Sequence, residues 1–121
     1  MLEQNQTVAY KSKRFALRIV KLHQFLTKEK REYILSAQVL RSGTSIGANI
    51  AECEFAFSQK DFLAKMYIAL KECGETIYWL ELLRDGGYIS DKMFQSLYTD
   101  CAELLRMMQS ITKTLKNKDN K

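Results

Sequence analysis

Residues 36–52 read SAQVLRSGTSIGANIAE and hold an apolar and a polar stripe at helical spacing. With the preceding leucine, the apolar stripe has the period of a helix packed against a core, and its members are Leu35, Val39, Gly43, Ile46 and Ile50. The polar stripe beside it comprises Gln38, Arg41, Ser42, Ser45, Asn49 and Glu52. Polar side chains next to a core must be satisfied by neighbouring helices or by a ligand, and the sequence leaves both interpretations open.

The chain has 121 residues, of which 46% are hydrophobic and none is proline. This length suits one continuous core, so we expect a single domain over residues 1–121. The absence of proline permits long helices. No stretch approaches the roughly 18 apolar residues of a membrane span, and the N-terminal residues lack the apolar run of a secretion signal. We therefore expect a cytoplasmic protein with no membrane partner.

Apolar residues at spacings of three and four predict four helices, over residues 7–28, 34–57, 59–85 and 91–116. The charged segment KEKRE at 28–32 has nothing to bury and predicts a turn. Ser58 is the expected N-cap of the third helix, and glycines 86–87 are expected to end it. Helices of this length with short links favour an all-α fold, an antiparallel up-down-up-down four-helix bundle. The last residues, KNKDNK at 116–121, are expected to fray.

The short link around Ser58 predicts which side chains meet across two helices. If the helices before and after Ser58 run in opposite directions, Arg41 lies level with Glu75, and Glu52 lies level with Lys65. We therefore predict an ion pair between Arg41 and Glu75 within the bundle.

Residues that carry chemistry are sparse in this chain. Cys53, Cys73 and Cys101 are far apart and form no C-x-x-C pair, which argues against disulfides and zinc and predicts buried free thiols. The single histidine, His23, follows Val20 where a di-iron bundle needs glutamate. The sequence offers no base placed to activate a serine or cysteine. We therefore predict no catalytic residue, no metal site and no cofactor, and a chain that is not an enzyme.

Positive charge is concentrated toward the two ends of the chain. Residues 1–41 carry nine Lys and Arg against three Asp and Glu, residues 42–110 carry six against ten, and residues 111–121 carry four against one. Basic segments attract phosphate backbones, although two solvated faces give the same pattern. If nucleic acid binds, we expect the contacts at seven cations of the first helix and the turn after it. These are Lys11, Arg14, Arg18, Lys21, Lys28, Lys30 and Arg31.

The helix expected over residues 59–85 has more apolar surface than one core requires. Beside its main stripe it carries a second apolar edge, made up of Leu63, Tyr67, Tyr78, Trp79 and Leu82. Aromatic residues are enriched at subunit contacts, which favours self-association. The alternative is that the core of the bundle absorbs these side chains.

Two segments of the chain resemble a known protein family. Residues 35–52, LSAQVLRSGTSIGANIAE, and residues 71–83, KECGETIYWLELL, are similar to motifs of small four-helix-bundle proteins encoded in intervening sequences of bacterial 23S rRNA genes. The resemblance extends from the region of Phe15 to the last expected helix. Gly47 and Cys53 depart from it, because many relatives have proline and glycine at these positions.

The resemblance implies properties that the residues alone do not give. It implies a left-handed antiparallel bundle that assembles as a ring of five subunits and has no catalytic activity. It also implies similarity to the accessory protein of diversity-generating retroelements, which binds a reverse transcriptase and nucleic acid. The motif positions that we interpret as structural are Arg41, Ser45, Asn49, Glu52, Glu72, Glu75, Tyr78 and Trp79. We assign the polar ones to internal hydrogen bonds that fix helix register, against the alternative of a ligand site.

The leading hypothesis is a non-enzymatic homo-oligomer whose basic first helix and tail contact RNA or DNA through phosphates and not through base sequence. The rival hypothesis is a protein–protein scaffold, or an accessory subunit of a partner enzyme, that does not touch nucleic acid. A structural protein without a ligand is the third. Binding to nucleic acid that weakens as salt rises separates the first hypothesis from the others.

Overall fold

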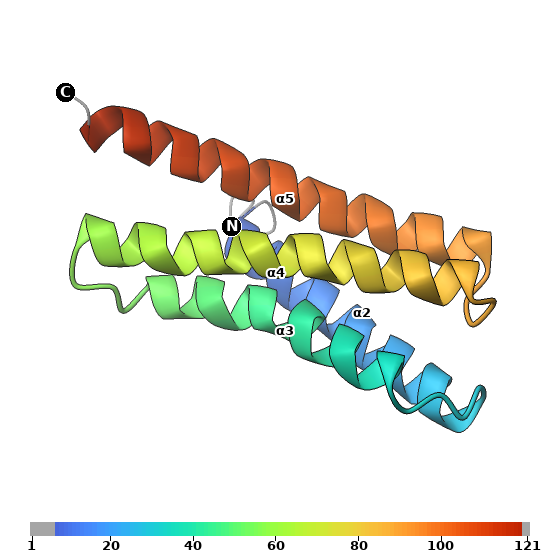
Figure 1. Ribbon diagram of the computed structural model, residues 1–121. Coiled ribbons are helices and arrows are strands. Elements are labelled where there is room, and N and C mark those ends of the chain that lie inside the picture. Colours follow the sequence, from blue (N-terminus) through green and yellow to red (C-terminus); the bar gives the residue numbers. More distant parts are fainter. Residues whose placement is uncertain (1–6, 120–121) are drawn as a thin grey trace.

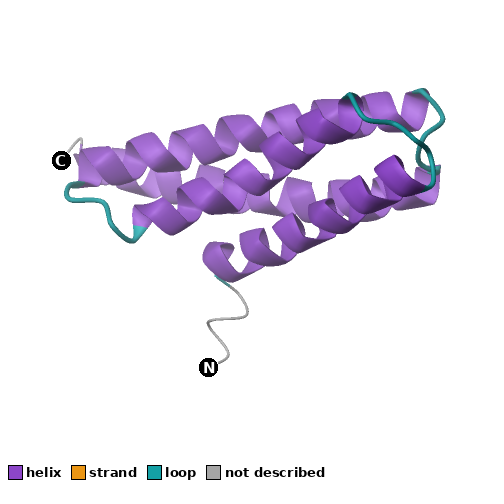
Figure 2. Cartoon of the chain, turned by 90° about the horizontal axis from the view of Figure 1, so that it is seen from below, coloured by secondary structure: helices purple, strands orange, loops and turns teal. Residues whose placement is uncertain are grey.

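The computed structural model describes residues 7–119, which form four helices and no strand (Figure 1). The helices are α2 (Val8–Lys28), α3 (Leu35–Cys53), α4 (Gln59–Asp85) and α5 (Asp91–Asp119). Short links join them, drawn in teal in Figure 2. The all-α prediction is therefore confirmed over the described part of the chain.

The four helices pack as neighbours in chain order. Helix α3 packs against α2 and α4, and α4 packs against α5. Helices α2 and α5 also touch, but less extensively than the other neighbouring pairs. Figure 1 shows why, because α2 lies at an angle to α4 and α5. The most basic helix is thus also the one that diverges from its neighbour.

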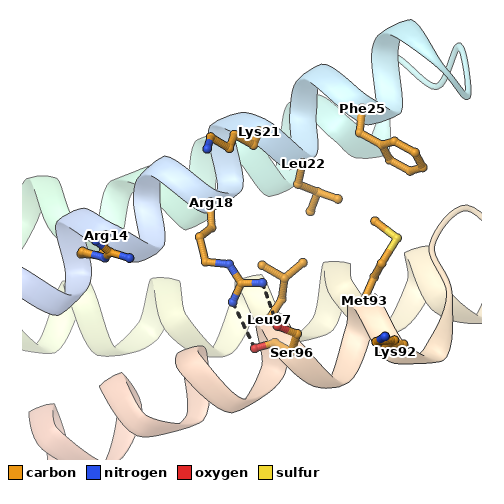
Figure 3. A pocket seen from close by; sticks show the side chains of 9 residues that line it. All are labelled: Arg14, Arg18, Lys21, Leu22, Phe25, Lys92, Met93, Ser96 and Leu97. Carbon is orange, nitrogen blue, oxygen red and sulfur yellow. Dashed lines mark hydrogen bonds between the residues drawn. The ribbon is translucent and has the colours of Figure 1, made fainter.

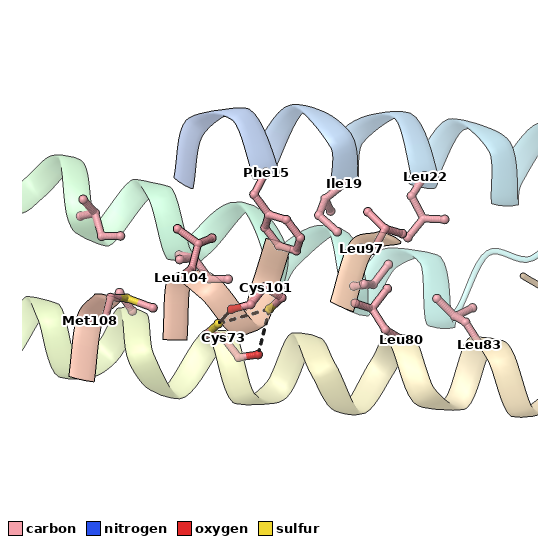
Figure 4. Close-up of a cluster of buried hydrophobic side chains, with 14 of the residues drawn as sticks. Phe15, Ile19, Leu22, Cys73, Leu80, Leu83, Leu97, Cys101, Leu104 and Met108 are labelled. Carbon is pink, nitrogen blue, oxygen red and sulfur yellow. Dashed lines mark hydrogen bonds between the residues drawn. The ribbon is translucent and has the colours of Figure 1, made fainter. Parts of the chain in front are cut away.

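The core is built from one apolar stripe on each helix (Figure 4). The stripe of α3 is confirmed, since all its predicted members are buried except Leu35, which is half-buried. The buried side chains labelled in Figure 4 come from the other three helices, and they are Phe15, Ile19, Leu22, Cys73, Leu80, Leu83, Leu97, Cys101, Leu104 and Met108. Burying one large apolar side chain stabilises the fold by about 1.5–3 kcal/mol, so these stripes dominate over local helix propensity.

Both ends of α4 match the sequence prediction. The Ser58 hydroxyl accepts the backbone N–H of Asp61 at 3.0 Å and caps the helix. At the other end, the N–H of Tyr88 donates to the carbonyl of Leu83 at 2.8 Å, and Gly87 has a φ of +83°. This is a Schellman turn, which needs a residue in the left-handed region. Gly87 therefore sets where α4 stops.

The charged segment 28–32 forms the predicted turn, and Arg31 there has a φ of +51°. The Glu32 carboxylate then accepts three successive backbone N–H groups at the start of α3, the closest being that of Ser36 at 2.7 Å. Partial burial raises the pKa of Glu32, but the three N–H donors outweigh it and hold the pKa below its ordinary value. The sequence analysis missed this cap, because glutamate is not among the usual N-cap residues.

Helix α3 is shorter than predicted. It ends at Cys53 and not at residue 57, because Cys53 is the last α3 side chain that reaches the core. The next three amides bond to carbonyls three residues back, which tightens the final turn and closes the helix. The link over residues 54–58 then leaves Phe55 and Phe57 82% and 91% exposed.

Helix α5 is longer than predicted. It begins at Asp91, as predicted, and the hydroxyl of Ser90 accepts the N–H of Met93 at 3.1 Å. It continues to Asp119, beyond the predicted end at residue 116, and the lysines in its last turn stabilise the negative end of the helix dipole. Residues 120–121 lie outside the described part of the chain.

Candidate nucleic-acid interface

Helix α2 carries six Lys and Arg and no acidic residue among its 21 residues. Because its apolar stripe faces the core, the cations lie on the flanks and the outer face. Spacings of three and four place Lys11, Arg14, Arg18 and Lys21 along one flank. The structure divides these four into two that pair with α5 and two that do not.

Lys11 and Arg18 connect α2 to α5. The Lys11 ammonium lies 2.8 Å from a carboxylate oxygen of Glu103. The Arg18 guanidinium lies 2.7 Å from a carboxylate oxygen of Asp100 and also donates to the Ser96 hydroxyl at 2.8 Å. Partly exposed pairs of this kind contribute about 0–1 kcal/mol each. They bridge α2 and α5, the pair of neighbouring helices that packs least extensively.

The other five predicted cations are exposed and have no ion pair within residues 7–119. Arg14 and Lys21 lie on the flank of α2, whereas Lys28, Lys30 and Arg31 lie at its end and in the turn that follows. The Lys30 ammonium lies 5.9 Å from the centre of the Phe25 ring. Two clusters of free positive charge therefore follow one another along the chain.

A groove of about 620 Å³ lies between α2 and α5, beside the flank of α2 (Figure 3). Its lining comprises Arg14, Arg18, Lys21, Leu22, Phe25, Lys92, Met93, Ser96 and Leu97. The structure thus brings three predicted cations together and adds Lys92 from α5. The sequence analysis did not name Lys92, because its place beside α2 depends on how the first and last helices pack.

The charged members of the polar stripe of α3 pair with α4. The Arg41 guanidinium lies 2.8 Å from a carboxylate oxygen of Glu72 and pairs with Glu75 as well. The predicted ion pair of Arg41 with Glu75 is therefore confirmed. The Lys65 ammonium lies 2.8 Å from a carboxylate oxygen of Glu52, at the level that the link around residue 58 predicts.

Three uncharged members of the stripe, Ser42, Ser45 and Asn49, also have partners within the protein. The hydroxyls of Ser42 and Thr76 are 2.9 Å apart and join α3 to α4 in the interior. The Asn49 amide donates to the carbonyl of Ser45 at 2.9 Å. Across the described residues, no buried side-chain nitrogen or oxygen is left without a hydrogen bond. Partners within α3 and on α4 thus satisfy the buried part of the stripe.

The two aromatic motif positions lie next to this network. The Trp79 indole donates to the Glu75 carboxylate at 2.9 Å. This bond and the Arg41 pair hold the pKa of Glu75 below its ordinary value. Tyr78 packs edge-on against Trp79, with ring centres 5.1 Å apart, and remains 53% exposed.

The second apolar edge of α4 is divided between core and solvent. Leu63, Trp79 and Leu82 are half-buried, so the bundle absorbs part of the edge. Tyr67 is 43% exposed, and the neighbouring Ile68 is 44% exposed. An apolar face therefore remains uncovered on the single chain.

The cysteines and the other metal-ligating residue types form no metal centre among the described residues. All three cysteines are free and buried, as predicted. The sulfurs of Cys73 and Cys101 lie 3.2 Å apart in the core, and this contact and burial raise the pKa of Cys101, which keeps its thiol protonated. No three metal-ligating side chains gather within residues 7–119. No helix in that part of the chain is long and apolar enough to cross a membrane.

The comparisons with known proteins agree on one family. Residues 4–110 match the family described as 23S rRNA-intervening sequence protein. The chain is also similar to the crystal structure of a protein of unknown function from the S23 ribosomal protein family of Bacteroides thetaiotaomicron. Their sequence identity is 49% and the TM-score is 0.88, over 91% of this chain and 98% of that one. No curated protein matches the chain. With its four-helix fold and its α3 and α4 motifs, this chain belongs to the family of 23S rRNA-intervening sequence proteins.

Proposed function

We propose that this chain is a non-enzymatic, cytoplasmic protomer of a ring-shaped homo-oligomer of antiparallel four-helix bundles, and that it binds RNA or DNA through the basic face of α2. The supporting observation is the charge of α2, which has six cations and no acid. Five of the seven predicted contact residues have no ion pair within residues 7–119, so they are available to phosphates. Helix α5 also carries lysines in its last turn, at the end of the bundle away from the turn that follows α2 (Figure 1).

A salt titration tests the nucleic-acid part of the proposal. The affinity for a fluorescein-labelled single strand of mixed sequence is measured by anisotropy between about 50 and about 200 mM salt. Five phosphate contacts predict a slope of log affinity against log salt of about −3.5. Binding that is absent at low salt, or that does not weaken as salt rises, contradicts the proposal.

A matched pair of variants locates the contact. The double variant Lys28→Gln, Lys30→Gln removes one exposed cation at the end of α2 and one in the turn after it, and we expect the magnitude of the slope to fall by about 1.4. The double variant Lys60→Gln, Arg106→Gln removes the same charge from exposed positions on α4 and α5. It should leave the slope nearly unchanged, because the contacts are proposed on α2.

The alternative function is a protein–protein scaffold, or an accessory subunit for a partner enzyme, without nucleic acid. The observation that favours it is the link between α3 and α4, where Phe55 and Phe57 are almost fully exposed. Exposed apolar side chains of this size are typical of protein contacts. The same salt titration distinguishes this scaffold from a nucleic-acid-binding protein, because a scaffold of this kind shows no anisotropy change at any salt concentration.

Self-association is supported by the apolar face that α4 leaves uncovered, at Tyr67, Ile68 and Tyr78. The resemblance to the family adds the expectation of five protomers. Light scattering in solution then gives a mass of about five times the 14.1 kDa of one chain.

A further inference from the structure

The groove between α2 and α5 has an apolar floor. Leu22 of α2 and Leu97 of α5 line it, and each is 4% exposed. Phe25 and Met93 project into the same opening from opposite helices (Figure 3). Both are half-buried, so each keeps part of its apolar surface in reach of a ligand. A flat apolar group can contact an aromatic ring on one side and a polarizable thioether on the other.

The rim of this groove is cationic. Arg14 and Lys21 line it from α2, Lys92 lines it from α5, and all three are exposed and outside any ion pair within residues 7–119. Arg18 lies between them and is bonded to Asp100. Among the described residues, no aspartate or glutamate lines the groove. Its positive charge therefore complements an anionic ligand.

The spacing of the cations favours several phosphates over one anionic head group. Arg14 and Lys21 are seven residues apart, which is about 10 Å along the axis of α2. Lys92 approaches from the other helix. A fatty acid or a phospholipid offers one anionic group and would leave most of these cations unused. Consecutive phosphates of a single strand extend over such a length, while its bases stack on aromatic and apolar side chains.

We propose that this groove binds a single-stranded segment of RNA or DNA, with one base against Phe25 and Met93 and the flanking phosphates on Arg14, Lys21 and Lys92. The inference rests on the proposed nucleic-acid binding and adds both the site and the strandedness. A duplex can use the cations, but its bases are stacked inside the helix and do not reach the apolar floor. Phe25 therefore determines the preference for a single strand, and Lys92 is a further phosphate contact.

The test compares a fluorescein-labelled RNA strand of mixed sequence with the same strand annealed to its complement, at one salt concentration. One stacked base predicts a preference of about tenfold for the single strand. In Phe25→Leu the site stays apolar but loses its ring, and we expect affinity for the single strand to fall about fivefold, with the duplex unchanged. Phe55→Leu removes an exposed ring from the opposite end of the bundle and should change neither affinity.

A second comparison tests the rim. The double variant Lys21→Gln, Lys92→Gln should weaken both forms of RNA and lower the magnitude of the single-strand salt slope by about 1.4. The control is again Lys60→Gln, Arg106→Gln, which makes the same change in charge elsewhere. If Phe25→Leu lowers the melting temperature of the protein, a second variant, Met93→Gln, changes the floor of the groove on the α5 side. We expect it to lose the preference for the single strand as well.

The outcomes separate this inference from the function on which it rests. Equal affinity for the two forms, or an unchanged single-strand preference in both floor variants, overturns the groove assignment but leaves nucleic-acid binding in place. Absence of binding to either form at low salt removes the proposed function itself. Vesicles of anionic phospholipid that displace the RNA, and that bind Phe25→Leu less well, assign the groove to a lipid and overturn the inference.

Discussion

At the scale of single residues, the contact between α2 and α3 depends on Gly43. A Cβ atom at this position would lie 2.8 Å from two side-chain carbons of Ile19, which is closer than apolar carbons pack. Ile19 is fully buried and β-branched, so it has little freedom to move aside. We expect Gly43→Ala to lower the free energy of unfolding by about 1–3 kcal/mol, measured by urea denaturation.

Gly74 provides the control for this prediction. It is exposed in the middle of α4, and a Cβ atom there meets no other atom within 4 Å. Gly74→Ala should therefore raise the free energy of unfolding by about 0.5–1 kcal/mol, because alanine favours the helix more than glycine does. A Gly43→Ala protein as stable as the wild type contradicts the close packing of α2 on α3.

Side-chain pairs between α3 and α4 could be predicted where pairing depends only on the height of each residue along the two helices. The link around Ser58 sets that level, so Arg41 with Glu75 and Glu52 with Lys65 followed from counting residues. The hydrogen bond of Ser42 to a threonine of α4 did not follow, because it depends on how each helix is rotated about its axis. The rotation of a helix about its axis is decided by the packing of the whole core, so it cannot be predicted from the sequence of one helix alone.

At the scale of elements, the start of α3 depends on one carboxylate. Glu32 accepts three backbone N–H groups, which is the role that an N-cap side chain plays in other helices. We expect Glu32→Gln to lower the free energy of unfolding at neutral pH by about 1 kcal/mol, because the amide has one acceptor oxygen and no charge. Glu29→Gln, an exposed position in the same turn, is the control and should have little effect.

The pH dependence gives this cap a distinct signature. Because the pKa of Glu32 is lower in the folded than in the unfolded chain, its contribution is complete above the ordinary glutamate pKa. The contribution is lost as pH falls through the lowered folded pKa. Denaturation curves at a series of acidic pH values should therefore show the wild type and Glu32→Gln converging. A difference in stability that stays constant from neutral to acidic pH would show that the charge of Glu32 is not what caps α3.

Element boundaries could be predicted where capping residues set them and not where burial did. Ser58 and Gly87 mark ends of α4 that the structure confirms. Apolar residues continue past Cys53 at Phe55 and Phe57, so the pattern predicted more helix there than the core can cover. A side chain with no surface to pack against adds little to helix stability, and α3 ends where its contacts with the core end.

At the scale of the whole molecule, the candidate site arises from the angle between α2 and α5. The cations of α2 could be read from the sequence because they share one helix. The groove and its lining by Lys92 could not be predicted from the sequence. They depend on how α2 and α5, which are far apart in the chain, pack side by side at an angle. The charge of the site is therefore a property of one segment, whereas its shape is a property of the assembled bundle.

The same scale decides whether the chain acts alone. A single bundle leaves the α4 face at Tyr67 and Ile68 in water at 43% and 44% exposure, and burial against a second copy removes that apolar surface from solvent. We expect Tyr67→Lys to reduce the mass measured by light scattering from several chains toward the 14.1 kDa of one, with helical circular dichroism retained. Tyr33→Lys changes a tyrosine that is 61% exposed in the turn before α3 and should leave the oligomer intact. A wild-type protein that already has the mass of one chain at micromolar concentration contradicts the proposed ring and the proposed contact through α4. Equal dissociation by both variants places the contact on a broader surface than the α4 face, because only a contact specific to α4 distinguishes the two tyrosines.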